Sequence, residues 1–205
     1  MTVLFDPRPL FVLLAGTALG AMGWLPEGFS SLIDPLLKGA LILLFLAIGL
    51  DMGKDPHLWE SLRSLSPRTL LLPAAALGGS IGGGVLAGMA TGLPLALSAS
   101  ASAGCGYYSI TMILLKEAAG IEAATVGFVA NLLREILIIV AMPLLVRLFG
   151  KNGAVGAAGA TAMDTALPFI VRSAGKEVAV LSFLSGVVLT LVIPLAVPLV
   201  YRLLL

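Results

Sequence analysis

The stretch that decides the fold is residues 153–171, which reads GAVGAAGATAMDTALPFIV. It is apolar enough for membrane depth, but glycines recur at every third position in its first half, and Asp164 and Pro168 follow. Helix-breaking residues and a carboxylate at that depth are tolerated only where the backbone is buried in protein or lines a water-filled cavity. We therefore interpret this stretch as a re-entrant or broken helical hairpin. A glycine-rich packing helix is the alternative, since glycine is common in membrane helices.

A similar stretch, Pro94–Leu115, comes earlier, and the two are related by an internal repeat. When the chain is shifted by 55 residues, Gly104 falls on Gly159 and Ser109 falls on Asp164. The match runs without a gap from about residue 103 to 204. It includes Gly120 on Gly175, Glu122 on Glu177, Pro143 on Pro198 and Arg147 on Arg202. Each unit is one odd segment followed by one long apolar helix, at 121–149 and at 177–205.

The composition is that of a polytopic membrane protein. Of the 205 residues, 59% are hydrophobic and 11% are charged, against roughly 45–50% and ~25% in soluble domains. Charged groups are too few to cover a globule in water, and a net charge of +1 offers no basic field for phosphates. Ordinary soluble enzymes, disordered proteins and nucleic-acid binders are therefore excluded.

The counts of cysteine and histidine limit the available chemistry. The single cysteine, Cys105, excludes an intrachain disulfide framework and a multi-cysteine zinc site, and the single histidine, His57, excludes a histidine-rich metal site. We expect no metal and no cofactor other than a coupling ion, either H⁺ or Na⁺.

Three apolar segments before the repeat are expected to cross the membrane: Pro9–Leu25, Asp34–Leu50 and Thr69–Met89. The first does not end in a secretory cleavage site, so we expect it to be retained. The polar stretch Asp51–Arg68 between the second and third is expected to be a solvated loop or an interfacial helix. The predicted organisation is a three-helix unit at 1–90, then hairpin-plus-helix units at 91–150 and 151–205.

The distribution of basic residues favours hairpins that dip into the membrane and return. With the N-terminus inside and both hairpins re-entrant, eight basic residues lie inside and three outside, against seven and four for seven full crossings. The predicted fold is all-α and polytopic, with about five transmembrane helices plus two re-entrant or broken hairpins in an inverted repeat. The C-terminus is then outside. The unit at 1–90 has no counterpart, so we expect a homodimer or pairing with a small three-span membrane protein.

Few ionisable residues are expected deep in the membrane, where a charge costs at least about 2.5–3.5 kcal/mol. Glu135 lies near the centre of the helix at 121–149, and Asn131 precedes it by four residues on the same face. Its neighbour Arg134 points about 100° away, so the two cannot simply pair with each other. Glu135 and Arg134 are candidates for proton coupling, and Asn131 is a candidate for substrate binding. The alternatives are a buried structural ion pair and a counter-charge role of Arg134 toward Asp164.

The hairpin tips supply the remaining candidates for substrate binding: Gly104, Gly106, Tyr107, Tyr108 and Ser109 in the first, and Thr161, Asp164 and Thr165 in the second. Amides at half-helix N-termini suit a carboxylate, and a carboxylate side chain suits an ammonium. The tips therefore predict a site for an amphoteric substrate. Two alternatives stay open: Asp164 could cap a half-helix that begins at Thr165, and the tyrosines could merely pack.

These motifs resemble the lysine exporter (LysO) family. The resemblance rests on LLFLAIGL at 43–50, GCGYYS at 104–109, NLLRE at 131–135 and GATAMDTALP at 159–168. It covers nearly the whole chain, but only the larger C-terminal part of a full-length member, and some members look split into a small chain and a chain of about this size. The resemblance implies export of L-lysine and of its toxic analogue thialysine. The intramembrane acidic residues implicated in the family would be Glu135 and Asp164 here.

We therefore expect a multi-pass protein of the cytoplasmic membrane that is not an enzyme and exports lysine by proton or sodium antiport. Asp164 would hold the ammonium, and Glu135 would exchange it for a proton. The rivals are an ion-coupled importer of carboxylates or amino acids with the same architecture, and a scaffold subunit that transports nothing. An intramembrane aspartyl protease using Asp51 and Asp164 is disfavoured, because Asp51 lies at a membrane edge and the Gly-x-Gly-Asp motif is absent.

Overall fold

The structure is a computed structural model that describes residues 8–22 and 71–205, together with positions 32, 35, 43, 46 and 50. The chain divides into two compact units, and residues 6–64 form one of them. In that unit the described helix is α1 (Arg8–Ala21), which begins one residue before the first expected span, Pro9–Leu25, and otherwise lies within it. The expected span Asp34–Leu50 lies largely outside the described residues, and the polar stretch with Asp51 and His57 lies wholly outside them.

The second unit, described from residue 71 onward, is helical throughout. Its helices are α4 (Leu71–Thr91), α5 (Leu95–Ala103), α6 (Tyr108–Ala158), α7 (Leu167–Ala174) and α8 (Ala179–Leu203), with the 3-10 turns η2 (Gly159–Met163) and η3 (Lys176–Val178). No strand occurs among the residues that the structure describes. The all-helical prediction is confirmed for this part of the chain.

Two glycines divide α6 into three rods. Gly120 has a φ of 87° and Gly150 a φ of 71°, in the left-handed region that glycine reaches without strain. The rods are 108–119, 121–149 and 151–158. The middle rod coincides with the long helix expected at 121–149, and Gly175, the repeat partner of Gly120, likewise has a positive φ before α8.

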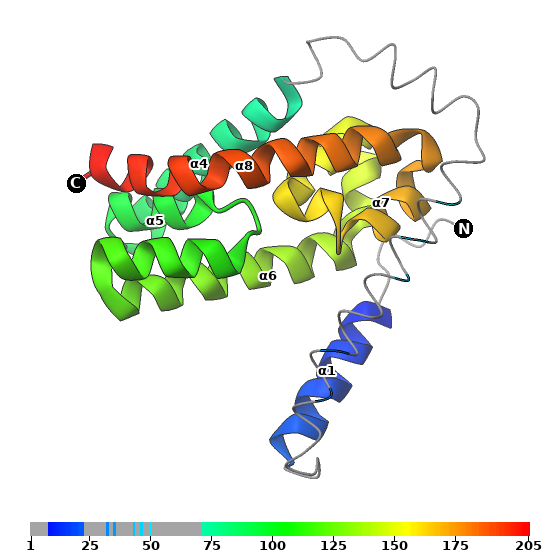
Figure 1. Cartoon of the computed structure of the whole chain (residues 1–205), viewed down its shortest axis with the longest axis horizontal. Helices are drawn as coiled ribbons and strands as arrows, with labels where there is room; N and C mark the ends of the chain where they lie inside the picture. The colour runs from blue at the N-terminus through cyan, green and yellow to red at the C-terminus, as the bar shows by residue number, and fades with distance from the viewer. Residues whose placement is uncertain are drawn as a thin grey trace. The chain divides into compact units, whose positions relative to one another are not determined.

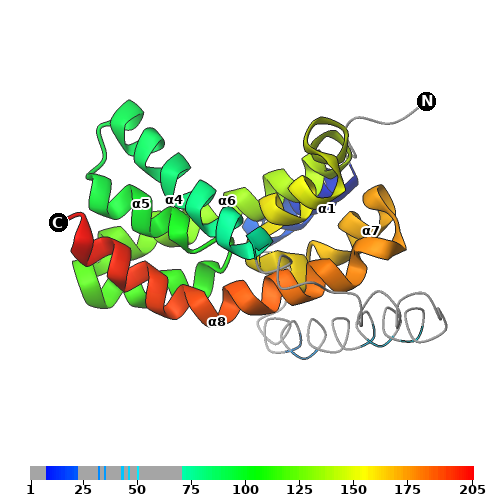
Figure 2. The same ribbon diagram turned by 90° about the horizontal axis from the view of Figure 1, so that it is seen from above.

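The short rods and the short helices form two hairpins. α5 and rod 108–119 make up the first hairpin, residues 95–119, and rod 151–158 and α7 make up the second hairpin, residues 151–174. The first hairpin lies toward the end of the bundle where α8 finishes, and the second lies toward the end where α8 begins (Figures 1 and 2). Lys151 and Glu177, which flank the second hairpin, form an ion pair, so its two ends lie close together.

Two hydrophobic clusters hold the hairpins against the long helices. The second hairpin packs on rod 121–149 through Met142, Val155 and Ile170, and the first hairpin packs beside α8 through Leu115 and Ile193. Alanines fill much of both clusters. Small residues let helices approach closely, as is typical of packing between membrane helices.

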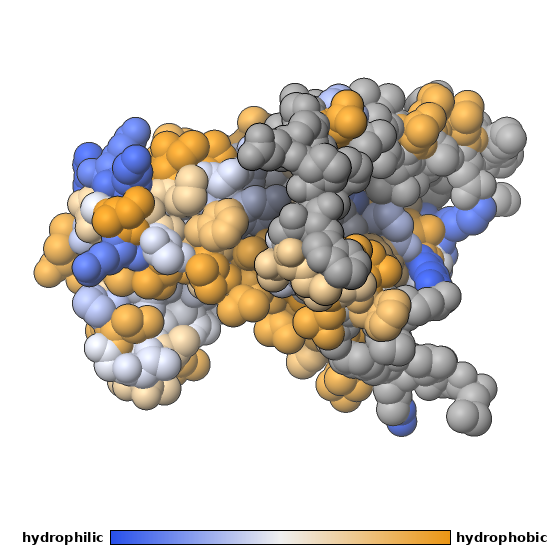
Figure 3. All heavy atoms as spheres, turned by 90° about the horizontal axis from the view of Figure 1, so that it is seen from below, coloured by the Kyte–Doolittle hydropathy of each residue, from blue (hydrophilic) through white to orange (hydrophobic). Residues whose placement is uncertain are grey.

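The outer surface of this unit suits a bilayer. Within the described residues, three helical stretches are long and apolar enough to cross a membrane: Leu71–Thr91, Tyr108–Met163 and Lys176–Leu203. Large side chains such as Leu137, Leu191 and Leu195 remain exposed on the isolated chain. Apolar residues cover much of one face, and hydrophilic residues gather mainly toward its ends (Figure 3). Exposed apolar surface of this extent marks a membrane or protein contact.

Candidate functional site

The tips of the two hairpins meet in the middle of the described bundle. The backbone N–H of Ala160 in the second tip donates to the carbonyl of Cys105 in the first, at 2.9 Å. Cys105 has a φ of 46°, which is unusual for a residue with a side chain. Gly159 has a φ of 67°, and a Cβ added there would collide with the Cys105 carbonyl. The crossing therefore depends on glycine at position 159.

Asn131 on rod 121–149 braces the first tip. Its Oδ1 accepts from the Gly106 N–H at 2.7 Å, and its Nδ2 donates to the carbonyls of Ala101 and Gly127, each at 2.8 Å. Gly104 packs so closely that a Cβ there would lie 2.8 Å from the Asn131 amide nitrogen. Because Asn131 is only 2% exposed, these bonds satisfy tip backbone that water cannot reach.

Two carboxylates converge where the tips cross. The Thr165 hydroxyl donates to Glu135 Oε1, and the Thr165 N–H donates to Asp164 Oδ1 at 2.6 Å. Thr165 therefore links an acid on rod 121–149 to an acid in the second tip. α7 begins at Leu167 without a side-chain cap, so Asp164 does not cap that helix in the way considered from the sequence.

A cavity of about 140 Å³ opens beside these carboxylates. Eight of the eleven residues proposed from the sequence line it: Gly106, Tyr107, Tyr108, Ser109, Glu135, Thr161, Asp164 and Thr165. The Tyr108 ring stands edge-on to Phe128, with the ring centroids 5.4 Å apart, which fixes the orientation of the tyrosine. Gly104, Asn131 and Arg134 do not line the cavity.

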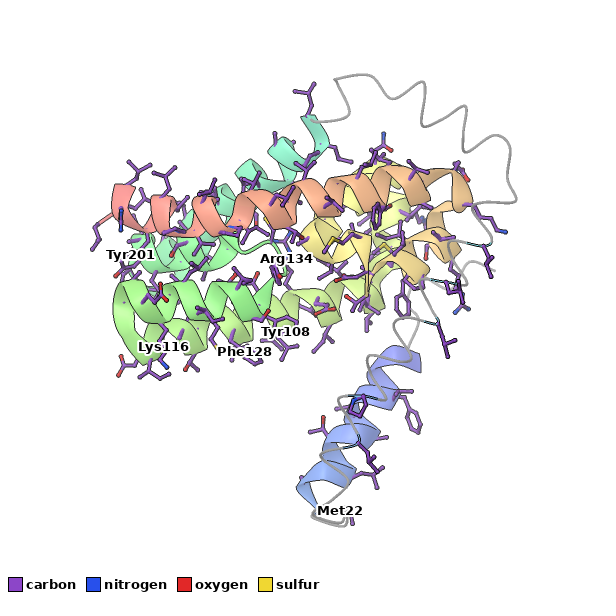
Figure 4. The ribbon with its side chains drawn as sticks, viewed as in Figure 1. Met22, Tyr108, Lys116, Phe128, Arg134 and Tyr201 are labelled. Atoms are coloured by element: carbon purple, nitrogen blue, oxygen red, sulfur yellow. The ribbon has the colours of Figure 1, made fainter. Side chains whose placement is uncertain are left out.

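Arg134 lies at the crossing but makes its hydrogen bonds elsewhere. Its Nη1 donates to Ser80 Oγ of α4 at 2.6 Å, and its Nη2 donates to the Ala157 carbonyl at 3.0 Å. Figure 4 shows it in the middle of the bundle, whereas Lys116 and Tyr201 lie toward one end. Within the described part of the chain, no cluster of three His, Cys, Asp or Glu side chains could hold a metal ion.

Three lining residues were missed by the sequence reasoning: Ala160, Met163 and Thr190. The 55-residue shift could have found two of them, because Thr190 is the repeat partner of Glu135 and Met163 is the partner of Tyr108. Gly106 with Thr161 and Ser109 with Asp164 are two further lining pairs. The cavity is therefore built largely from equivalent positions of the two repeat units, and each carboxylate has a hydroxyl-bearing residue at the equivalent position of the other unit.

Comparison with known proteins shows the family to which the chain belongs. Residues 10–201 match the family model described as "Lysine exporter LysO". The "Lysine exporter LysO" of Escherichia coli strain K12 is 27% identical over 186 residues, which are 91% of this chain and 60% of that protein. The "Putative lysine exporter" of Haemophilus influenzae is 30% identical over 185 residues, 89% of this chain and 93% of that protein. The chain thus spans about 60% of the length of the first relative. No solved structure matches it.

Proposed function

The chain belongs to the lysine exporter (LysO) family, and from this premise we propose that it carries L-lysine, and analogues such as thialysine, out of the cell across the cytoplasmic membrane. The observation that carries the proposal is the convergence of Glu135 and Asp164 on one cavity at the crossing of the hairpins. Two carboxylates are a costly arrangement at membrane depth unless a cation compensates for them.

The cavity offers partners for two of the charged groups of lysine, its side-chain ammonium and its carboxylate. Asp164 binds the side-chain ammonium, with the hydroxyls of Thr161 and Thr165 nearby as further oxygen ligands. The substrate carboxylate lies toward the amides at the start of rod 108–119, where Tyr107 and Ser109 line the cavity and no side chain caps the helix. At about 140 Å³ the cavity is smaller than the roughly 300–1,000 Å³ of drug-sized sites, and it suits a molecule no larger than a single amino acid.

Glu135 couples transport to a counter-ion, H⁺ or Na⁺, that replaces the lysine on the return step. The carboxylate accepts a bond from Thr165, the residue that also contacts Asp164, so its charge state is linked to the substrate-binding acid. The expected part of Arg134 in this coupling stays a prediction, and its hydrogen bonds to Ser80 and Ala157 support an additional structural part.

The two hairpins enter the membrane from opposite faces in an inverted repeat. The supporting observations are that each hairpin lies at a different end of the bundle (Figures 1 and 2) and that Gly120 and Gly175 begin the two long helices in similar conformations. With the N-terminus inside, this arrangement puts the C-terminus outside. The helices at 1–90 then lack a counterpart, and a second copy or a small three-span membrane protein supplies it.

The test is efflux of labelled lysine from proteoliposomes that contain the purified protein. We expect lysine to leave faster than from protein-free vesicles, and faster still when the outside is acidic or contains Na⁺, whichever ion is coupled. Protein with Asp164→Asn should behave like the protein-free vesicles. Efflux at the protein-free rate from wild-type vesicles would contradict export by this chain alone. If addition of a small three-span partner then restored efflux, the proposed pairing would be supported instead.

A further inference from the structure

The two hairpins share a feature that is not part of the substrate site. In each, a carbonyl in the last turn of the first half-helix is hydrogen-bonded to Arg134, directly or through Ser80. The Ala157 carbonyl, in the last turn of rod 151–158, accepts directly from Nη2 at 3.0 Å. The Ser102 carbonyl, in the last turn of α5, accepts from Ser80 Oγ at 2.6 Å, and that oxygen in turn accepts from Arg134 Nη1 at 2.6 Å. One guanidinium therefore ties together α4 and both hairpins.

The charges at this point are matched. The carbonyl end of a helix carries roughly half a negative elementary charge, so two such ends together offset one guanidinium. The Ser102 carbonyl also accepts from the Cys105 N–H at 3.1 Å, so the bond from Ser80 is its second. A hydrogen bond from a charged donor, as at Ala157, is among the stronger ones available. The charge of Arg134 is thus offset by helix ends and the Ser80 hydroxyl, without a hydrogen bond to either carboxylate.

The contact between the tips lies directly beside this arginine. A Cβ added to Gly159 would come within 3.3 Å of Arg134 Nη2, and it would also collide with the Cys105 carbonyl that accepts from Ala160. The arginine therefore sits behind the crossing of the tips, and Glu135, the next residue on the same rod, bonds Thr165 at the cavity. Of these two neighbouring residues on rod 121–149, Arg134 bonds the ends of the half-helices, and Glu135 bonds a residue of the cavity.

We propose that Arg134 and Ser80 form a positioning clamp that holds the two hairpin tips against each other and so keeps the lining of the cavity in place. The clamp fixes where the half-helices end, and the cavity is built from residues that follow those ends. Neither residue lines the cavity. The consequence for transport rests on the proposed function, whereas the consequence for the contact between the tips does not.

Cys105 gives a readout of that contact which needs no transport. It is the single cysteine of the chain, it lies in the first tip, and it is 0% exposed. We would measure the rate at which N-ethylmaleimide labels Cys105 in membranes without lysine. Ser80→Ala and Arg134→Gln should each raise the rate by about tenfold or more, the change expected when one hydrogen bond to a charged group is lost. The double variant should label no faster than Arg134→Gln alone, because either substitution by itself breaks the chain of hydrogen bonds from Ser102 through Ser80 and Arg134 to Ala157.

Matched controls and a rescue make the test specific. Ser182→Ala removes a buried hydroxyl that bonds only within its own helix, and Arg147→Gln removes an exposed arginine of the same rod, so both should label like wild type. Ser80→Thr retains the hydroxyl and should restore protection. If Arg134→Gln does not accumulate, Ser80→Ala and Ser80→Thr still decide the matter. Wild-type labelling in Ser80→Ala would overturn the clamp.

Transport by the same variants separates positioning from proton coupling. Ser80→Ala should lower the maximal rate of lysine efflux and leave its pH dependence unchanged. Loss of the pH dependence in Ser80→Ala or Arg134→Gln, with Cys105 labelled at the wild-type rate, would overturn the clamp and assign the arginine to coupling. If no variant and no wild-type protein exports lysine, the proposed function fails, while the labelling result still stands for the clamp.

Discussion

Replacing Asn131 by leucine tests the brace on the first hairpin tip. Leucine has the same branched shape with somewhat bulkier ends, so no cavity is created, but the Gly106 N–H loses its acceptor. An orphaned buried N–H costs about 1–3 kcal/mol. The Ala101 carbonyl keeps a bond from the Gly104 N–H at 3.2 Å, so its loss is limited to one net hydrogen bond of about 1 kcal/mol. The total is a destabilisation of about 2–4 kcal/mol.

Circular dichroism during heating in detergent is the appropriate assay, because the described fold is helical. For a chain of this length, about 2–4 kcal/mol corresponds to a fall in Tm of roughly 4–16 °C. Thr125→Val is the control on the same rod, since its exposed hydroxyl bonds only the Ile121 carbonyl of its own helix and its loss should cost under about 0.5 kcal/mol. An Asn131→Leu melting curve that overlays the Thr125→Val curve would refute the reasoning.

Four further outcomes follow from the site. Asp164→Asn should abolish lysine efflux at unchanged protein levels in the membrane, since it keeps the shape but removes the charge that balances an ammonium; wild-type efflux would remove Asp164 from the substrate site. Glu135→Gln should retain lysine binding and lose the pH dependence of efflux, whereas loss of the protein itself would indicate a structural role. Gly159→Ala should expose Cys105 to N-ethylmaleimide, because a methyl group there meets the Cys105 carbonyl; continued protection would show that the tips do not need their close crossing. In a Cys105→Ser background, cysteines at Glu122 and Asn152 should label from opposite faces of the membrane, and labelling from one face would contradict re-entrant hairpins.

Periodicity and composition predicted the rods well, because membrane helices must satisfy their backbone internally. The rod at 121–149 has the expected bounds, and α4 ends two residues later than the expected Thr69–Met89, whose first two residues lie outside the described part of the chain. Gly120 and Gly175, which the repeat aligns, both adopt positive φ before the two long helices, a feature that was not predicted from the sequence. The number of spans and the inverted orientation stay predictions, because the described residues supply three candidate spans and no membrane.

The part of the candidate site that could be predicted consists of ionisable residues within apolar segments. Glu135 and Asp164 stand out in apolar sequence, and the structure brings them together through Thr165, a contact over 30 positions of sequence that no local pattern contains. Arg134 and Ser80 show the opposite case. Because Arg134 is next to Glu135, the sequence indicated an electrostatic role, but its guanidinium donates to the Ala157 carbonyl and to Ser80. Ser80 lies in a glycine-rich segment, and no sequence pattern singled it out. Thr190 could have been found by applying the repeat to Glu135.

Competition between lysine and norleucine for the purified protein directly tests whether Asp164 binds the side-chain ammonium of lysine. Norleucine has the carbon chain, amine and carboxylate of lysine, but lacks the side-chain ammonium that Asp164 is proposed to hold. Labelled lysine should be displaced by lysine and only at roughly 10–100-fold higher concentration by norleucine, the ratio expected for one hydrogen bond to a charged group. Asp164→Asn should remove that difference. Equal displacement by the two compounds from wild-type protein, or undiminished preference for lysine in Asp164→Asn, would contradict the account.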